Sequence, residues 1–144
     1  MDKDVFVTIK GIHTTNNDSD DTEILIPGEY YFRNNKHFIC YEEVSESNGE
    51  KSKSVMKISN NMVELIKRGS GSSHLIFEKD KKNYSLYNTG MGNLYLGVDT
   101  SDIQMITSED ERRIDVKINY SLEINQQKVS DCEVSIVVSS DSML

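Results

Sequence analysis

The fold of this chain is decided by one stretch of its sequence, RRIDVKINYSLEI, at residues 112–124. Every even position from Ile114 to Ile124 is apolar or aromatic, and every odd position between them is polar or charged. Successive side chains of a strand point to opposite faces, so this pattern predicts a strand with one dry face and one wet face. After a turn at 125–128 the alternation returns at even positions from Cys132 to Val138. We therefore expect a long hairpin that needs further strands to cover its apolar face.

The rest of the chain reads as a series of strands joined by turns. The expected strands cover 5–12, 23–32, 36–44, 54–59, 62–68, 74–79, 84–89 and 93–106. We expect an acidic loop at 16–21, a bulge or sheet edge at Pro27-Gly28, and a kink or break at 99–102. About ten strands in sequential hairpins fit an up-and-down barrel or a two-sheet sandwich. We favour the barrel, closed or nearly closed, as a single all-β domain over residues 1–144, because closure removes exposed edges.

Composition limits the classes of function. The net charge of −8 argues against binding to nucleic acid or to anionic membranes, which both need clustered cations. No apolar run approaches the roughly 20 residues that span a bilayer, and the N-terminus shows no signal peptide, so no membrane insertion is expected. Cys40 and Cys132 lack metal-site spacing and are expected as reduced, buried thiols. We expect a cytoplasmic protein.

The middle of the chain resembles the YwiB-like proteins. The resemblance rests on the order and spacing of Tyr41-Glu42-Glu43, Met56-Lys57-Ile58, Val63-Glu64-Leu65, Arg68 and the run from Tyr84 through Gly92-Asn93-Leu94-Tyr95-Leu96 to Thr100. It implies a small cytoplasmic bacterial protein with a calycin-type, lipocalin-like antiparallel barrel. Cys40, where an aromatic residue is usual, and the turn at 88–92 depart from the family pattern. The family has no established biochemical activity, so the resemblance implies a fold and no reaction.

A barrel of about eight strands either fills its centre with side chains or holds one small ligand. All seven tyrosines fall within expected strands, and an interior tyrosine offers an apolar ring together with a hydroxyl that needs a partner. The candidates for lining a ligand cavity are Tyr41, Tyr84, Tyr95 and Tyr120. The alternative is an ordinary core whose hydroxyl groups point to the barrel ends.

Glu42 and Arg68 give a more specific prediction than the tyrosines, because their charges suggest which kind of ligand would bind. Glu42 alternates with Phe38 and Cys40, and Arg68 alternates with Met62 and Ile66. If those faces point inward, both charges lie at the barrel mouth, where a desolvated guanidinium needs an anionic partner. We expect Arg68 to hold an anionic head group and Glu42 to orient it; the alternatives are a structural ion pair or exposure at a strand end.

Other chemistry-bearing residues give weaker signals. The three histidines could in principle hold zinc, but alternation places His74 outward and His13 at a strand end, so no metal site is expected. The acidic segment at 18–23 lacks the glycine of a calcium loop. The segment Gly69-Ser70-Gly71-Ser72-Ser73 lacks the lysine of a phosphate loop. We expect no cofactor.

These observations leave three hypotheses. The first is a barrel without catalysis that binds a small amphipathic or acyl-like molecule, with Tyr41, Glu42 and Arg68 at the open end. The second is an interaction or scaffold protein with a filled barrel that meets a protein partner or forms a homodimer. The third is a hydrolase-like enzyme with Glu42 and Tyr41 as acid and base. An inward carboxylate with a strongly raised pKa would favour the third hypothesis.

Overall fold

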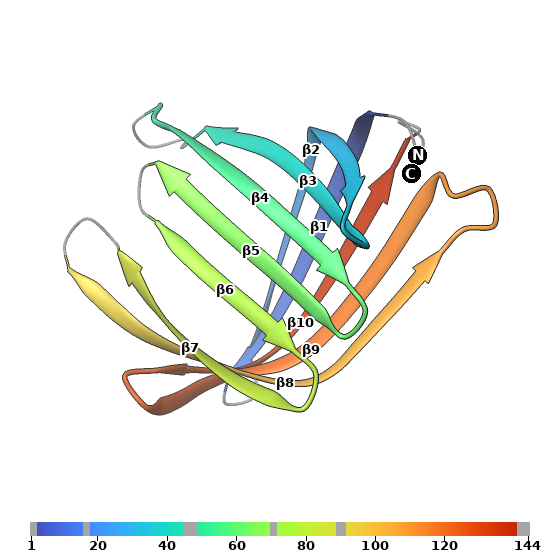
Figure 1. Cartoon of the computed structure of the whole chain (residues 1–144). Helices are drawn as coiled ribbons and strands as arrows, with labels where there is room; N and C mark the ends of the chain where they lie inside the picture. Colours follow the sequence, from blue (N-terminus) through green and yellow to red (C-terminus); the bar gives the residue numbers. More distant parts are fainter. Residues whose placement is uncertain (1–2, 16–17, 45–48, 70–71, 89–91, 141–144) are drawn as a thin grey trace.

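The protein forms a nearly closed, all-β barrel in a computed structural model (Figure 1). The structure describes residues 3–15, 18–44, 49–69, 72–88 and 92–140. The strands are β1 (Asp4–Thr15), β2 (Asp18–Arg33), β3 (Lys36–Val44), β4 (Lys51–Ser59), β5 (Met62–Gly69), β6 (Ser73–Glu78), β7 (Lys81–Asn88), β8 (Asn93–Thr107), β9 (Arg113–Ile124) and β10 (Gln127–Ser139). Within the described residues, no helix has the length and apolar character to cross a membrane.

All ten strands belong to one antiparallel sheet in the order β6-β5-β4-β3-β2-β1-β10-β9-β8-β7. Apart from β6 and β7, strands that follow each other in the chain are neighbours in the sheet. β1 also pairs with β10, so the first and last strands lie side by side (Figure 1). The sheet therefore has its two ends at β6 and β7, which follow each other in the chain but share no ladder in the described part.

The turn at Lys79 and Asp80 explains this seam between β6 and β7. The amide of Lys79 donates to the carbonyl of Asn61 in the β4–β5 turn, at 3.1 Å. The amide of the next residue, Asp80, donates to the carbonyl of Thr100 on β8, at 2.9 Å. Two consecutive amides of this turn thus bond to different strand pairs, Lys79 beside β5 and Asp80 on β8. In the described part, β6 and β7 form no hairpin ladder with each other.

The alternation of dry and wet faces predicted for residues 112–124 is confirmed. Ile114, Val116 and Ile118 on β9 are buried, with Ile118 at 0% exposure, while Lys117 between them is exposed. β9 pairs with β10 so that Ile118 lies opposite Val134. The buried core comprises Val5, Val7, Ile39, Tyr41, Met56, Ile58, Val63, Phe77, Val98, Ile114, Val116, Ile118, Ile136 and Val138. Apolar side chains from both halves of the chain therefore fill the barrel centre.

Two local expectations have different outcomes. The kink expected at 99–102 is confirmed as a register shift between Thr100 and Asp102, which moves the inward face of β8 by one position. The acidic loop expected at 16–21 is wrong from Asp18 onward, because β2 begins there and pairs with β1 from Thr15↔Asp18. Residues 16–17 and the side chains of 18–20 lie outside the described part.

Pro27-Gly28 marks a sheet edge and not a bulge. The β2–β3 ladder ends at Gly28↔Tyr41, whereas β2 continues its pairing with β1 through Pro27↔Phe6. Residues of β2 that precede Gly28 therefore pair on the β1 side alone, and a proline is tolerated where a ladder donor is not required.

Candidate functional site

The β2–β3 hairpin builds one wall of a pocket at the end of the barrel. Asn34 and Asn35 turn the chain with φ angles of 53° and 60°, the left-handed values that a two-residue hairpin needs. This tight turn places Phe32 directly opposite His37, with ring centroids 5.0 Å apart. Tyr30 lies two residues before Phe32 on the same face, and its hydroxyl is 2.7 Å from Nδ1 of His37.

The opposite wall comes from the end of β8, the start of β9 and the loop between them. Thr107 pairs with Ile114, whose side chain is 0% exposed. The loop is held by Ser108: its Oγ donates to Asp110 at 2.6 Å, and its carbonyl accepts from the amide of Glu111 at 2.9 Å. Glu111 has a φ of 58°. These contacts fix Glu111 on the rim of the pocket.

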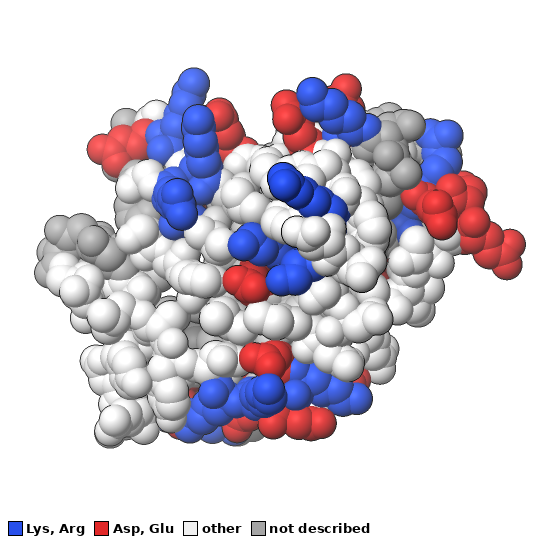
Figure 2. Space-filling model, in the orientation of Figure 1, with Lys and Arg blue, Asp and Glu red and all other residues white. Residues whose placement is uncertain are grey.

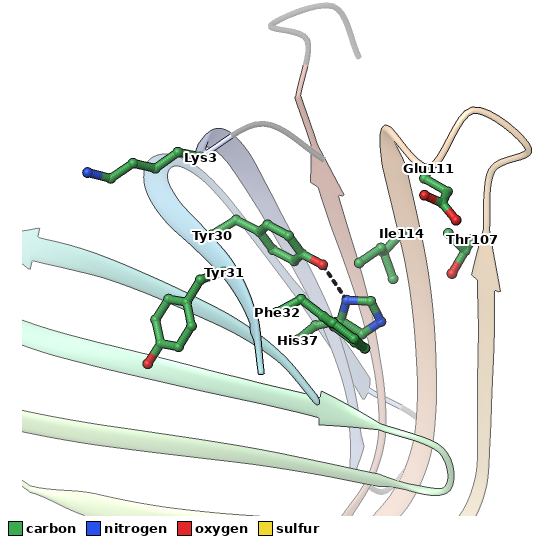
Figure 3. A pocket seen from close by; sticks show the side chains of 8 residues that line it. All are labelled: Lys3, Tyr30, Tyr31, Phe32, His37, Thr107, Glu111 and Ile114. Atoms are coloured by element: carbon green, nitrogen blue, oxygen red, sulfur yellow. Dashed lines mark hydrogen bonds between the residues drawn. The ribbon is translucent and has the colours of Figure 1, made fainter. Parts of the chain in front are cut away.

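Together the two walls enclose a pocket of about 620 Å³ at this mouth of the barrel (Figure 3). Its lining residues are Lys3, Tyr30, Tyr31, Phe32, His37, Thr107, Glu111 and Ile114. Ile114 belongs to the buried core, whereas Phe32 at the rim is 56% exposed. The pocket thus has an apolar floor, aromatic sides and polar groups near its opening.

Burial sets the protonation of the polar pair in this pocket. It lowers the pKa of His37, so the imidazole is neutral at pH 7. Burial, together with the carboxylate of Glu111, raises the pKa of Tyr30, so the phenol is also neutral. When the Tyr30 hydroxyl donates to Nδ1, the neutral imidazole carries its proton on Nε2. The mouth then offers Nε2–H as a hydrogen-bond donor.

Two of the tyrosines predicted to line a cavity are packed in the interior. Tyr41 is 5% exposed, and burial raises its pKa to about 12. Tyr120 lies edge-on to Phe77 with centroids 4.9 Å apart, and burial raises its pKa as well. Both rings contribute to or pack against the filled core.

The inward placement predicted for Glu42 and Arg68 is wrong. On β3 the buried residues are Ile39 and Tyr41, so Glu42 points outward and is exposed. On β5 the buried residue is Val63, so Arg68 is likewise exposed on the outer face. On both strands the inward face carries the odd-numbered residues and not the even-numbered ones, and a difference of one residue moves a strand side chain to the opposite face.

The charged pair on the inward faces of these strands is Glu43 with Lys67. Their side chains are half-buried, and Lys67 Nζ lies 3.9 Å from Glu43 Oε2. This distance is long for an ion pair, and both groups retain contact with water. The pair stands at the barrel end opposite the β2–β3 turn, so it takes no part in the pocket of Figure 3.

Tyr84 and Tyr95 also lie outside the barrel, contrary to the predicted cavity lining. They are 47% and 37% exposed, and their rings stack with centroids 5.1 Å apart and an angle of 4° between their planes. Lys82 lies 5.5 Å from the centroid of the Tyr84 ring and makes a 2.7 Å ion pair with Glu123. This cluster covers the outer surface of β7, β8 and β9.

A second hollow, more open to solvent, lies where β2 and β3 separate and has a volume of about 650 Å³. Tyr41 and Glu42 contribute to its lining, with Pro27, Glu29 and Lys53 around them. Cys40 lies within it, and burial, followed by the nearby Glu29, raises the pKa of its thiol. A raised pKa keeps the thiol protonated, which lowers its reactivity.

The two histidines whose side chains the structure describes lie apart, since His37 lines the mouth pocket and His74 pairs with Glu64. His74 is on the outer face, as predicted, with Nε2 2.9 Å from Glu64. The side chain of His13 and residues 70–71 of the glycine-serine segment lie outside the described part. No group of three histidine, cysteine, aspartate or glutamate side chains in the described ranges is arranged to hold a metal ion.

Comparison with known proteins places this barrel in a family. A model for the Domain of unknown function (DUF1934) matches residues 7–136. The chain belongs to this family. A solved structure described as the ywiB protein from Bacillus subtilis covers 97% of the chain and matches over 93% of its own length, with a TM-score of 0.84 and 20% identity. The YwiB-like resemblance is thus confirmed for the fold, while the relation to calycins stays a prediction. A comparison with curated protein sequences found no match.

Sequence reasoning missed the mouth pocket. Its residues come from the hairpin at 30–37 and from the segment 107–114, which lie far apart in the chain. One signal was present: a two-residue Asn34-Asn35 turn fixes Phe32 opposite His37 and so gathers aromatic rings at one barrel end.

Proposed function

We propose that this protein binds a small amphipathic molecule at the barrel mouth formed by β2, β3 and the β8–β9 loop, without catalysis. The observation that supports this proposal is the pocket itself, in which buried Ile114 and the ring of Phe32 lie beside the polar groups of His37, Thr107 and Glu111. Ligand sites are typically concave and mostly apolar, with a few placed polar groups. Because side chains fill the centre, the ligand would lie in the mouth and not in the interior.

The hydrolase alternative has less support. Glu42 is exposed on the outer face, and Tyr41 is enclosed in the core near Ser54. A pKa raised to about 12 makes the Tyr41 phenol a poor acid at neutral pH. The predicted acid and base therefore point away from each other, and no shared reacting position lies between them.

Native mass spectrometry of protein purified from its own host tests the proposal. We expect a mass above that of the chain, which disappears on denaturation as a small molecule is released. Phe32→Ala should lower the retained fraction, because the ring is 56% exposed and lines the pocket without belonging to the core. Leu25→Ala, equally exposed at 56% but outside the pocket, is the matched control. Equal retention by both variants would refute the proposed site.

A second candidate function is a protein–protein contact at the outer surface of β7. Leu86, 62% exposed, lies beside the stacked rings of Tyr84 and Tyr95. Figure 2 shows an uncharged area at lower left, where the β9–β10 turn lies next to β7 and β8 in Figure 1. Exposed apolar side chains that gather on one surface mark sites of protein–protein contact. If the contact is a homodimer, sedimentation should show a dimer that Leu86→Lys converts to a monomer; a monomer at all concentrations argues against it.

The expected cytoplasmic location is part of the same proposal. Cys40 and Cys132 are both thiols, which agrees with a reducing compartment. Fractionation of host cells would test the location directly, and recovery of the protein outside the cytoplasm would refute it.

A further inference from the structure

We propose that the ligand of the mouth pocket carries a positively charged, organic ammonium head group. This inference deepens the proposed function and rests on it. It states that the lining residues bind an ammonium head group more tightly than the carboxylate head group of a fatty acid.

The first observation is the concentration of aromatic faces around the pocket. Tyr30, Phe32 and His37 come from two adjacent strands, with ring centroids 5.8 Å apart for Tyr30 and His37 and 5.0 Å for Phe32 and His37. An ammonium within about 6 Å of the centroid of a phenylalanine or tyrosine ring is attracted by the negative face of that ring. Several rings around one opening form the kind of cage that recognises alkylated ammonium groups.

The second observation is the distribution of charge. Glu111 supplies a carboxylate on the side of the pocket opposite the rings (Figure 3). This carboxylate acts on the same space as the rings, since it contributes to the raised pKa of Tyr30. Lys3 is the cation among the lining residues, and Figure 3 shows its ammonium directed away from Tyr30, His37 and Glu111.

The third observation is the neutrality of the polar pair. The half-buried imidazole of His37 has a pKa that is lowered by burial and by the positive charge of the N-terminal amino group, so it offers no positive charge to a carboxylate head group at neutral pH. A carboxylate in this pocket would meet Glu111 without a compensating cation from His37. The whole chain, with a net charge of −8, adds a field that favours cations near its surface.

Isothermal titration calorimetry with three probes of equal chain length tests the inference. The probes are decyltrimethylammonium, decanoate and decanol, each below the concentration at which it forms micelles. We expect decyltrimethylammonium to bind about ten-fold or more tightly than decanoate. Amide chemical-shift changes should map its binding to residues 30–37 and 107–114.

Two variants separate the contributions of charge and ring. Glu111→Gln should weaken binding of the ammonium about two- to five-fold, whereas Glu109→Gln, exposed in the same loop but outside the lining, should not. Phe32→Leu keeps an apolar side chain and removes the ring. Phe32→Leu should weaken the binding of decyltrimethylammonium about two- to five-fold and leave the binding of decanol unchanged.

The outcomes distinguish the two levels of the proposal. If none of the probes changes the amide chemical shifts of residues 30–37 and 107–114, the proposed function and the head-group inference both fail. If decanoate or decanol binds there as tightly as the ammonium, the mouth site stands and the head-group inference is overturned. Equal weakening by Glu109→Gln and Glu111→Gln would also overturn it, since the attraction would then come from the acidic surface in general.

Discussion

Ile118→Ala tests the alternation on which the whole barrel depends. Ile118 is 0% exposed and packs in the core, opposite Val134 on one side and Ile103 on the other. The change removes three carbon atoms, which at about 0.8 kcal/mol per buried methylene gives about 2.4 kcal/mol of lost transfer energy. The cavity left behind adds to this loss, so the expected decrease in the free energy of unfolding is about 2–5 kcal/mol.

The matched control is Lys117→Ala, one residue away on the same strand. Lys117 points outward, and its ammonium pairs with Glu133 at 2.7 Å in a contact that is largely open to water. An exposed ion pair adds little to stability, so this variant should unfold at nearly the same urea concentration as the parent.

Urea titration followed by circular dichroism measures both variants, because the chain has no tryptophan to report by fluorescence. With a slope of about 2 kcal/mol per molar urea, a loss of about 2–5 kcal/mol should lower the midpoint of Ile118→Ala by about 1–2.5 M. If that variant is too unstable to purify, Ile118→Val should still show a loss of about 0.5–1.5 kcal/mol. A larger loss for Lys117→Ala than for Ile118→Ala would refute the assignment of faces, and with it the barrel.

Further predictions concern the mouth and the turns. Because burial lowers the pKa of His37, the unfolded chain binds this proton at higher pH than the folded one, so stability is full above about pH 6.5 and falls as the pH drops below it. His37→Gln should reduce the difference between urea midpoints at about pH 7.5 and 5.5, and an unchanged difference would contradict this reasoning. Gly69→Ala should destabilise strongly, since φ is 124° and a Cβ would lie 2.7 Å from the carbonyl oxygen of Lys51. Gly49→Ala, with φ of 70° and no atom within 4 Å, should cost less, and thermal melts of the two variants check the order.

The sequence was informative where one face of a strand was clearly apolar. On β9 every even residue from Ile114 to Leu122 is apolar and every odd one polar, so a single assignment of faces was available, and the structure confirms it. The barrel followed from this pattern and from the hairpin spacing, because an antiparallel sheet with one dry face must curve to enclose that face.

The assignment failed where both faces of a strand are apolar. On β3 Phe38 and Cys40 alternate with Ile39 and Tyr41, so hydrophobicity alone does not choose the inward face. The outer face of this strand is partly covered as well: Phe38 stacks on Tyr31 with centroids 4.8 Å apart. Periodicity could not separate an aromatic pair on the outer surface from core packing, and the placement of Glu42 was wrong for that reason.

The candidate site could not be derived from the sequence because it depends on tertiary structure. Glu111 and His37 are separated by about half of the chain (111 minus 37 is 74 of 144 residues), and the closeness of their loops results from the position of β1 and β10 in the middle of the sheet. A pattern that repeats every second residue specifies which face of each strand is dry. It does not specify which barrel end keeps an opening after the side chains have packed.

The pairing of β1 with β10 also determines how this protein folds during synthesis. Val7 on β1 lies opposite Val138 on β10, so β1 meets its partner only after 131 further residues have been synthesised (138 minus 7). Contacts of such sequence separation carry a large loop-closure entropy and slow the formation of the native state. Until β10 emerges, one edge of β1 stays open to other nascent chains, and we expect the unfinished polypeptide to be a substrate for chaperones.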